Sequence, residues 1–163
     1  MARCYSVSAQ NVTTTGSTAN LAFAFVNPGT TCSLQFQRAW LSQNGSTTSA
    51  MNTAAIQTQV TAFPTLTSTT PAKLNFLDPV SQITGGTAGA AGTAGTNASA
   101  AGAGGKSAIY NDNFNVLNGW LWVPTPLEVI VMNAGASSGL GVYSPTAWTS
   151  TGGWSGGCTY QEL

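Results

Sequence analysis

Histidine is absent from this sequence of 163 residues, and charged residues are scarce. Four basic and four acidic residues make up only 5% of the chain, whereas a typical soluble domain has about 25%. Without histidine, the chain lacks the usual general base near neutral pH and the commonest metal ligand. Four carboxylates also leave few pairs that could bind a cation. We therefore expect no enzyme activity, no metal and no cofactor.

The formal net charge of zero also argues against two classes of partner. Neither a nucleic acid nor an acidic membrane would be attracted by the overall field of the protein. Residues 1–7 carry one positive charge but no apolar run of the roughly 7–15 residues found in a signal peptide. No apolar stretch approaches the roughly 18 residues of a transmembrane helix. We expect a protein made in the cytoplasm that binds neither nucleic acid nor membrane.

Neutral polar residues take the place of charge. The chain has 16 Ser, 24 Thr, 12 Asn and 8 Gln, together with 19 Gly. Disorder is nevertheless a poor interpretation, because 42% of the residues are hydrophobic and five are Trp. The length suits a single domain with one core, spanning residues 1–163. The Thr-rich and Trp-rich composition favours strands over helices.

The clearest strand lies at residues 32–40, where apolar and polar residues alternate. This alternation places Trp40 on the same apolar face as the residues at 32, 34 and 36, with Arg38 as an interruption of that face. The apolar segment 21–26 comes before it and stops at Asn27-Pro28-Gly29, a turn sequence. We therefore predict a hairpin made of these two strands.

Further short apolar segments are separated by Gly, Pro and Asn. The pattern favours eight to ten strands in an antiparallel β-sandwich or barrel. The Thr-rich residues 65–70 are interpreted as a connection between strands. The remaining predicted strands are 55–60, 73–77, 120–123, 128–132, 140–143 and 154–162.

Residues 84–107 differ from the rest of the chain, because they consist mainly of Gly, Ala and Thr and include no large apolar residue. Such a low-complexity insertion is unusual inside a compact domain unless it is a functional loop or a linker. We predict a long surface loop that is mobile or ordered by a partner. The alternative is a hinge between two subdomains.

Two catalytic motifs are matched only in part. Residues 102–107 resemble the end of a phosphate-binding loop, but Ala100 stands where the first glycine is needed. Residues 153–157 match the G-x-S-x-G pattern of a hydrolase, but no histidine is present to take the serine proton. The four carboxylates, Asp78, Asp112, Glu128 and Glu162, are interpreted as capping and surface groups rather than a glycosidase pair.

Cys4, Cys32 and Cys158 are odd in number and widely spaced. This arrangement fits neither a disulfide framework nor a zinc site, so we expect buried reduced thiols. Whether Cys4 and Cys158 approach each other near the two termini is left open at this point.

Trp120 and Trp122 point the same way from one predicted strand. Such a pair could stack on sugar rings, which makes a carbohydrate-binding or adhesive module one possible function. The other interpretation is an ordinary β-core or a subunit interface, where tryptophan is also common.

Three segments of the chain form a recognisable pattern: residues 1–9, 117–126 and 156–163, with sequences MARCYSVSA, LNGWLWVPTP and GGCTYQEL. Together they resemble small structural proteins of tailed bacteriophages, namely head decoration or capsid cement proteins. The resemblance implies a jelly-roll β-sandwich that assembles as a homotrimer on the outer capsid surface. It further implies a virion protein that clamps neighbouring subunits of the major capsid protein.

Composition and resemblance thus lead to the same hypothesis, a non-enzymatic protein that binds itself and a capsid lattice. Weak contacts repeated on a shell would add up through effective concentration. For subunit or capsid contacts we predict Arg3, Trp120, Trp122 and Tyr160. The carbohydrate-binding module of a virion or fibre remains the alternative hypothesis.

Overall fold

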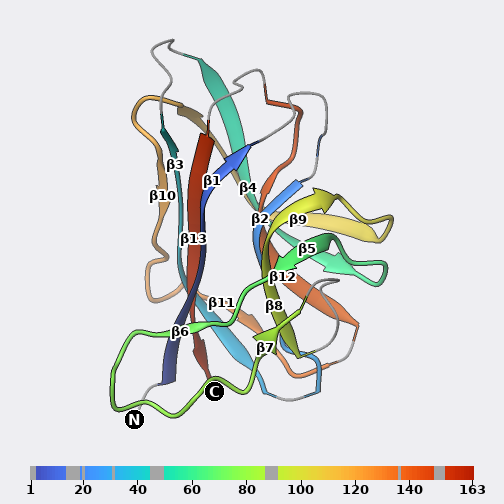
Figure 1. Ribbon diagram of the computed structural model, residues 1–163, viewed down its shortest axis with the longest axis vertical. Coiled ribbons are helices and arrows are strands. Elements are labelled where there is room, and N and C mark those ends of the chain that lie inside the picture. The colour runs from blue at the N-terminus through green and yellow to red at the C-terminus, as the bar shows by residue number, and fades with distance from the viewer. Residues whose placement is uncertain are drawn as a thin grey trace.

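The computed structural model of the chain describes residues 3–13, 19, 21–30, 32–44, 50–86, 92–135, 137–148 and 153–163. Every regular element in those ranges is a strand, and the strands form two sheets that pack against each other (Figure 1). The prediction of an all-β antiparallel sandwich is therefore confirmed. The jelly-roll connectivity stays a prediction.

The first sheet has six strands, and its centre is made by the two ends of the chain. Figure 1 shows β1 and β13 side by side, with both termini at the same end of the sandwich. The order across the sheet is β10-β3-β13-β1-β6, and β11 also pairs with β3. The bounds are β10 Trp120–Trp122, β3 Leu34–Asn44, β13 Gly153–Glu162, β1 Arg3–Thr13, β6 Ala72–Lys73 and β11 Ile130–Met132.

The second sheet has seven strands in the order β5-β8-β2-β12-β4-β9, with β7 added alongside β8. All its pairs are antiparallel except β7 with β8. The bounds are β5 Thr65–Ser68, β8 Thr93–Ala100, β2 Leu21–Asn27, β12 Ser138–Ser144, β4 Met51–Val60, β9 Gly105–Asn115 and β7 Thr84–Gly85.

The main core lies between the sheets and is rich in aromatic rings. Trp148 and Trp154 are buried with ring centroids 4.3 Å apart. Phe23 stacks on Trp148 at 4.8 Å, and Phe114 meets Trp154 edge-on at 6.0 Å. These rings come from strands and loops of both sheets, so their burial holds the two sheets together.

Strand β2 is buried along its whole length. Its Val26 faces the main core, whereas its Phe25 belongs to a second apolar cluster on the outer face of the sheet. Leu66 and Phe63 cover that outer cluster. A strand covered on both faces needs apolar residues at nearly every position, which explains the unbroken apolar run at 21–26.

The position and register of β3 show that two predictions were wrong. It lies in the first sheet whereas β2 lies in the second, so the predicted hairpin is wrong, and the turn at Asn27-Pro28-Gly29 crosses between sheets. The pairing of β3 with β13 shifts at Gln37, an extra residue that reverses the alternation. Trp40 therefore lies on the outer face, where the Arg38 guanidinium sits 5.4 Å from its ring centroid.

Residues 84–107 also require a correction, because most of those that the structure describes are in strands. β8 pairs with both β2 and β5, so it lies inside the sheet. Small side chains make this possible: a Cβ on Gly95 would lie 2.6 Å from the Leu66 Cβ. The prediction of a loop was wrong here because backbone hydrogen bonds, and not large side chains, hold this strand. Residues 87–91 lie outside the described residues.

Two shorter segments also differ from expectation. Residues 65–68 form strand β5 rather than a connection, and the predicted strand 73–77 contributes only Lys73 to β6. The strands β1 and β9 were not predicted, although each has 11 residues. Across the described part of the chain, no helix is long and apolar enough to cross a membrane.

Candidate functional site

The four residues predicted to make subunit or capsid contacts fall into two groups. Arg3 is exposed at the start of β1. Tyr160 has no exposed surface, and Trp120 and Trp122 expose only 5% and 8% of theirs. Tyr160 and Trp120 are covered by their own chain, so the structure corrects the contact prediction for these two residues. Trp122 is also largely buried, but part of its ring lines a pocket that opens to solvent. The two tryptophans do point the same way, but they point into the core.

Trp122 lines a pocket at one side of the sandwich. The pocket lies between the edge strand β9 of one sheet and β10 and β11 of the other. The Trp122 ring packs 6.1 Å from Phe36 and 6.3 Å from Tyr110. We call this cavity the edge pocket. It has a volume of about 220 Å³ and is lined by Ile109, Tyr110, Trp122, Glu128 and Ile130.

Large apolar side chains are exposed on the strands and loops that wall the edge pocket. Leu127 is 99% exposed in the loop between β10 and β11. The others, each between about half and three-fifths exposed, are Ile109, Leu121, Val123 and Val131. Isolated exposed apolar residues are normal, but a group of them on one side of a protein indicates an interaction surface.

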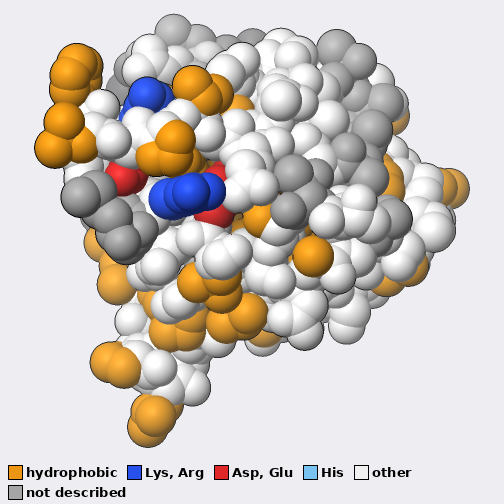
Figure 2. Space-filling model, turned by 90° about the horizontal axis from the view of Figure 1, so that it is seen from below, with side chains coloured by type: hydrophobic (Ala, Val, Ile, Leu, Met, Phe, Trp, Pro, Cys, Tyr) orange, Lys and Arg blue, Asp and Glu red, His pale blue; other side chains and the backbone are white. Residues whose placement is uncertain are grey.

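A second group of exposed apolar side chains lies on the segment of residues 74–83, which follows β6. We call this segment the strap. It crosses the end of the sandwich where the two termini lie, and that end carries apolar, basic and acidic side chains close together (Figure 2). Phe76 is 94% exposed, Leu77 76%, Val80 72% and Leu74 56%.

A tight turn fixes the tip of the strap. The amide of Leu77 donates to Oδ1 of Asn75 at 3.0 Å, and the amide of Asp78 donates to the Asn75 carbonyl at 3.0 Å. This is a turn stabilised by an asparagine side chain, which holds Phe76 and Leu77 outward. The signal for this turn in the sequence was Asn75 followed by Asp78-Pro79, but the apolar residues favoured a strand.

Polar contacts fasten the rest of the strap to β1. Asp78 is only 2% exposed, and its Oδ2 accepts a hydrogen bond from the amide of Cys4 at 3.2 Å. The phenol of Tyr5 donates to the carbonyl of Pro79 at 3.1 Å. The strap is therefore anchored by groups that lie beneath it, while its apolar tip remains in solvent.

Ser81 and Glu162 make the second anchor of the strap. The Ser81 hydroxyl lies 2.5 Å from Oε1 of Glu162 and 3.0 Å from the hydroxyl of Tyr160. The same Glu162 oxygen accepts the amide of Gln82 at 2.9 Å. Burial raises the pKa of Tyr160, and the charge of Glu162 raises it further. The phenol thus keeps its proton and serves as a hydrogen-bonding group rather than a base.

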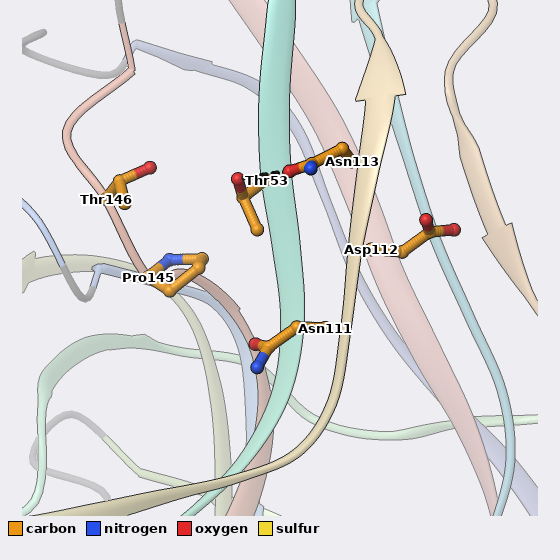
Figure 3. Close-up of a pocket in the computed structure, with 6 residues that line it drawn as sticks. All are labelled: Thr53, Asn111, Asp112, Asn113, Pro145 and Thr146. Carbon is orange, nitrogen blue, oxygen red and sulfur yellow. Dashed lines mark hydrogen bonds between the residues drawn. The ribbon is translucent and has the colours of Figure 1, made fainter.

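A larger pocket of about 430 Å³ lies beside β4 and β9, and we call it the polar pocket because most of its lining residues are Asn or Thr. Figure 3 shows Asn111, Asn113 and Thr53 on the side that faces Pro145 and Thr146, whereas Asp112 points to the other side of β9. The Thr53 hydroxyl donates to Oδ1 of Asn113 at 2.6 Å. Amides and hydroxyls could hydrogen-bond a neutral polar ligand, but none of the described residues that line this pocket is aromatic.

Neither catalytic motif forms a catalytic structure. The Lys106 ammonium donates to the carbonyls of Gly102 at 2.9 Å and Gly104 at 3.4 Å, so it binds its own loop. A phosphate loop would instead present backbone N–H groups to an anion. Residues 153–157 lie within strand β13 and not at a strand-to-helix turn.

The three cysteines are free thiols, and two of them are buried. Cys4 pairs in register with Gln161 and Val7 pairs with Cys158, so the two cysteines stand three residues apart along the ladder. Burial raises the pKa of Cys32 to about 11 and also raises that of Cys158. The described residues contain no group of three or more acidic or cysteine side chains that could hold a metal ion.

Comparison with known proteins identifies no family. No family model matches the chain, and no curated protein matches it. A structure of the infectious bursal disease virus Gt strain is 12% identical, with a TM-score of 0.21 over 99% of this chain and 42% of that chain. The structure of alginate lyase A1-II' is 14% identical, with a TM-score of 0.18 over 97% of this chain and 76% of that chain. Scores this low carry no argument about fold or function.

Proposed function

We propose that this chain is a non-enzymatic virion structural protein, a capsid decoration or cement protein that binds copies of itself and stabilises the lattice of a major capsid protein. The observation that carries the proposal is the gathering of large exposed apolar side chains on the strap and around the edge pocket. A soluble monomer rarely exposes such groups together, because covering them with a partner is favourable.

The scarcity of charge supports the same proposal. Burying a charge in an interface costs free energy unless the charge is well paired. With 5% charged residues, this protein can have most of its surface covered by neighbours without that cost. A shell that presents the same site many times would then multiply individually weak contacts.

The polar groups that hold the strap in place also favour a structural role. The buried carboxylates of Asp78 and Glu162 accept hydrogen bonds that hold the strap in place. Burial keeps the nearby Tyr160 phenol protonated. These groups thus position an exposed apolar tip, which is what a protein that docks on a lattice requires.

Sedimentation with empty capsid shells tests the proposal. The shells should be assembled from the major capsid protein that is encoded nearest to the gene of this chain. We expect the protein to sediment with them, with little difference between about 0.05 and 0.5 M salt, because apolar contacts are not screened. A protein that remains monomeric and stays in the supernatant at both salt concentrations would contradict the proposal.

The polar pocket favours a second candidate function, binding of a neutral glycan. Asn111, Asn113 and Thr53 would supply hydrogen bonds to sugar hydroxyls. The tryptophan platform cannot contribute, since Trp120 and Trp122 are buried. A shift of amide NMR signals at Asn111 with neutral glycans, lost in Asn111→Ala, would support this function. The absence of any shift across a broad glycan set would exclude it.

A further inference from the structure

The strap and the edge pocket lie at opposite edges of the first sheet. The strap follows β6, which pairs with β1 at one edge. The edge pocket is walled by β10 and β11, which pair with β3 at the other edge. One feature projects and the other is hollow, so two copies of the chain could engage edge to edge.

The strap tip has the properties of an inserting group. Phe76 and Leu77 expose 94% and 76% of their surface. The Asn75 turn holds their backbone in place, with both hydrogen bonds at 3.0 Å. A group that is already fixed loses less conformational entropy on binding than a flexible one. The tip is therefore prepared to enter a pocket without rearrangement.

The edge pocket has the properties of a receiving site for a side chain. Its walls are two aromatic rings, Tyr110 and Trp122, and two isoleucines, Ile109 and Ile130. Its volume of about 220 Å³ is below the range of about 300–1,000 Å³ typical of small-molecule pockets. A cavity of this size and chemistry suits one or two apolar side chains rather than a cofactor.

The exposed charges at the strap end of the sheet are opposite in sign to the charged residue that lines the edge pocket. Arg3 and Lys73 are exposed on adjacent strands at the strap end of the sheet. The acidic residues at the same end, Asp78 and Glu162, are buried. At the edge pocket the charged lining residue is the exposed Glu128. Docking of one copy on another would bring the basic side chains toward this carboxylate.

Strand pairing through β9 is a less suitable way for copies to associate. The register of β9 with β4 shifts at Ile109, which marks a bulge in the free edge. Asp112 pairs with the core residue Ala54, so it lies on the inward face of this edge strand while remaining exposed. Bulges and inward charges are two features that prevent strand addition at sheet edges. Insertion of side chains avoids this obstacle.

We infer that the strap tip of one copy, Phe76 and Leu77, inserts into the edge pocket of a second copy of this chain. This inference rests on the proposed self-association and names the surfaces that perform it. Because the two surfaces differ, the contact is heterologous, and it forms a closed ring where the rotation between copies permits. A two-fold rotation gives a dimer with two reciprocal contacts, and a three-fold rotation gives a trimer.

Two variants separate the two halves of the contact. Phe76→Ser removes the tip, and Ile109→Lys places a charge in the pocket, at a residue that is 49% exposed. Leu117→Ser is the matched control, because Leu117 is 53% exposed in the turn between β9 and β10 and is not among the residues that line the pocket. The molar mass of each protein is measured by size-exclusion chromatography with light scattering, after thermal unfolding has shown an unchanged fold.

We expect wild type and Leu117→Ser to form the same ring and each of the other variants to be monomeric. An equal mixture of Phe76→Ser and Ile109→Lys should form a one-to-one dimer, because one intact tip and one intact pocket remain. Lys73→Glu should weaken assembly about three-fold, the size expected for one exposed charge pair, and Glu128→Lys in the same chain should restore it.

Three outcomes would overturn the inference: a wild-type monomer, a Phe76→Ser variant that assembles like wild type, or a mixture that stays monomeric. The proposed function is judged separately by sedimentation with shells. A wild-type monomer that still binds shells would retain the function without this contact. An oligomer that depends on Phe76 but ignores the shells would retain the contact and refute capsid binding.

Discussion

The free energy of unfolding should fall steeply as the pH rises above 9. Burial raises the pKa of three thiols and three phenols in the folded chain, so the folded protein holds their protons more tightly than the unfolded chain does. These groups are Cys4, Cys32, Cys158, Tyr5, Tyr143 and Tyr160. With histidine absent, they are the main source of pH dependence on the alkaline side.

The direction of this pH dependence follows from the number of protons that the folded and unfolded states bind. Above the ordinary thiol pKa of 9.0, an unfolded chain has released protons that the folded chain still holds. The unfolded state therefore binds fewer protons, and stability falls with rising pH. The stabilising effect is complete below pH 9 and is lost as the pH rises through the folded pKa, which is about 11 for Cys32. Lys106 acts in the opposite direction, since burial lowers its pKa, but it is one group against six.

The loss in free energy of unfolding at high pH can be estimated from the two most buried thiols. Cys158 has no exposed surface and Cys32 exposes 6%. Each thiol that is ionised in the unfolded chain and protonated in the folded one contributes about 1.4 kcal/mol per pH unit. Two thiols thus remove roughly 2–3 kcal/mol between pH 10 and pH 11, and the phenols add to this loss. Typical domains have only about 5–15 kcal/mol in total.

Urea unfolding followed by tryptophan fluorescence, in reducing buffer at fixed ionic strength, measures this dependence. The free energy of unfolding of wild type should be level near pH 8 and decline above pH 9. Cys158→Ala should reduce the slope by about 1.4 kcal/mol per pH unit, whereas Cys4→Ala, at a partly exposed position, should change it little. A wild-type stability that stays constant to about pH 11, or an unchanged slope in Cys158→Ala, would refute the reasoning.

Substitutions at three further positions test the buried contacts, each by urea unfolding at pH 7. Glu162→Ala should cost about 3 kcal/mol, because Ser81 and a backbone amide lose a charged acceptor, and Glu162→Gln should recover most of that loss. Gly139→Ala should cost about 2 kcal/mol or more, since its Cβ would lie 2.1 Å from the Phe25 ring. Trp148→Ala should cost about 3–5 kcal/mol as a core truncation. Losses below about 0.5 kcal/mol would contradict the contacts described.

Much of the strand content could be predicted from local pattern. The apolar run at 21–26 and the alternation in 55–60 correspond to β2 and β4. The turn at Asn27-Pro28-Gly29 is also confirmed, with Gly29 at a φ of +57° and its amide bound to Oδ1 of Asn27 at 2.9 Å. These features depend on neighbouring residues, so a sequence can reveal them.

The wrong predictions concern features that depend on contacts with residues distant in the sequence. The predicted hairpin was wrong because pairing to β13 and β12 draws the two strands into different sheets. The face of Trp40 was wrong because a single bulge at Gln37 reverses the alternation. Residues 93–100 were interpreted as part of a loop, although contact with Leu66 requires a glycine at 95. None of these contacts lies near in sequence.

The predictions of contact residues were limited in the same way, because burial depends on the tertiary structure. Residue type singled out Trp120, Trp122 and Tyr160 for subunit or capsid contacts, but the structure buries all three side chains almost completely. Phe76 and Leu77 were assigned to a predicted strand, although the structure exposes both side chains. The sequence pattern of apolar residues before a turn is the same whether those residues are buried or exposed. Only the anchoring of the strap by Asp78 and Glu162 reveals which apolar groups remain in solvent.

The sequence by itself determined the fold class of this protein: a weakly charged chain of short apolar segments separated by Gly, Pro and Asn forms an all-β fold. Composition and spacing suffice for that conclusion because propensity and charge are properties of the residues themselves. The tertiary structure alone decided which sheet each strand joins, which aromatic residues are core, and where the strap tip and the edge pocket lie. Those outcomes depend on long-range pairing and burial, which no local pattern contains.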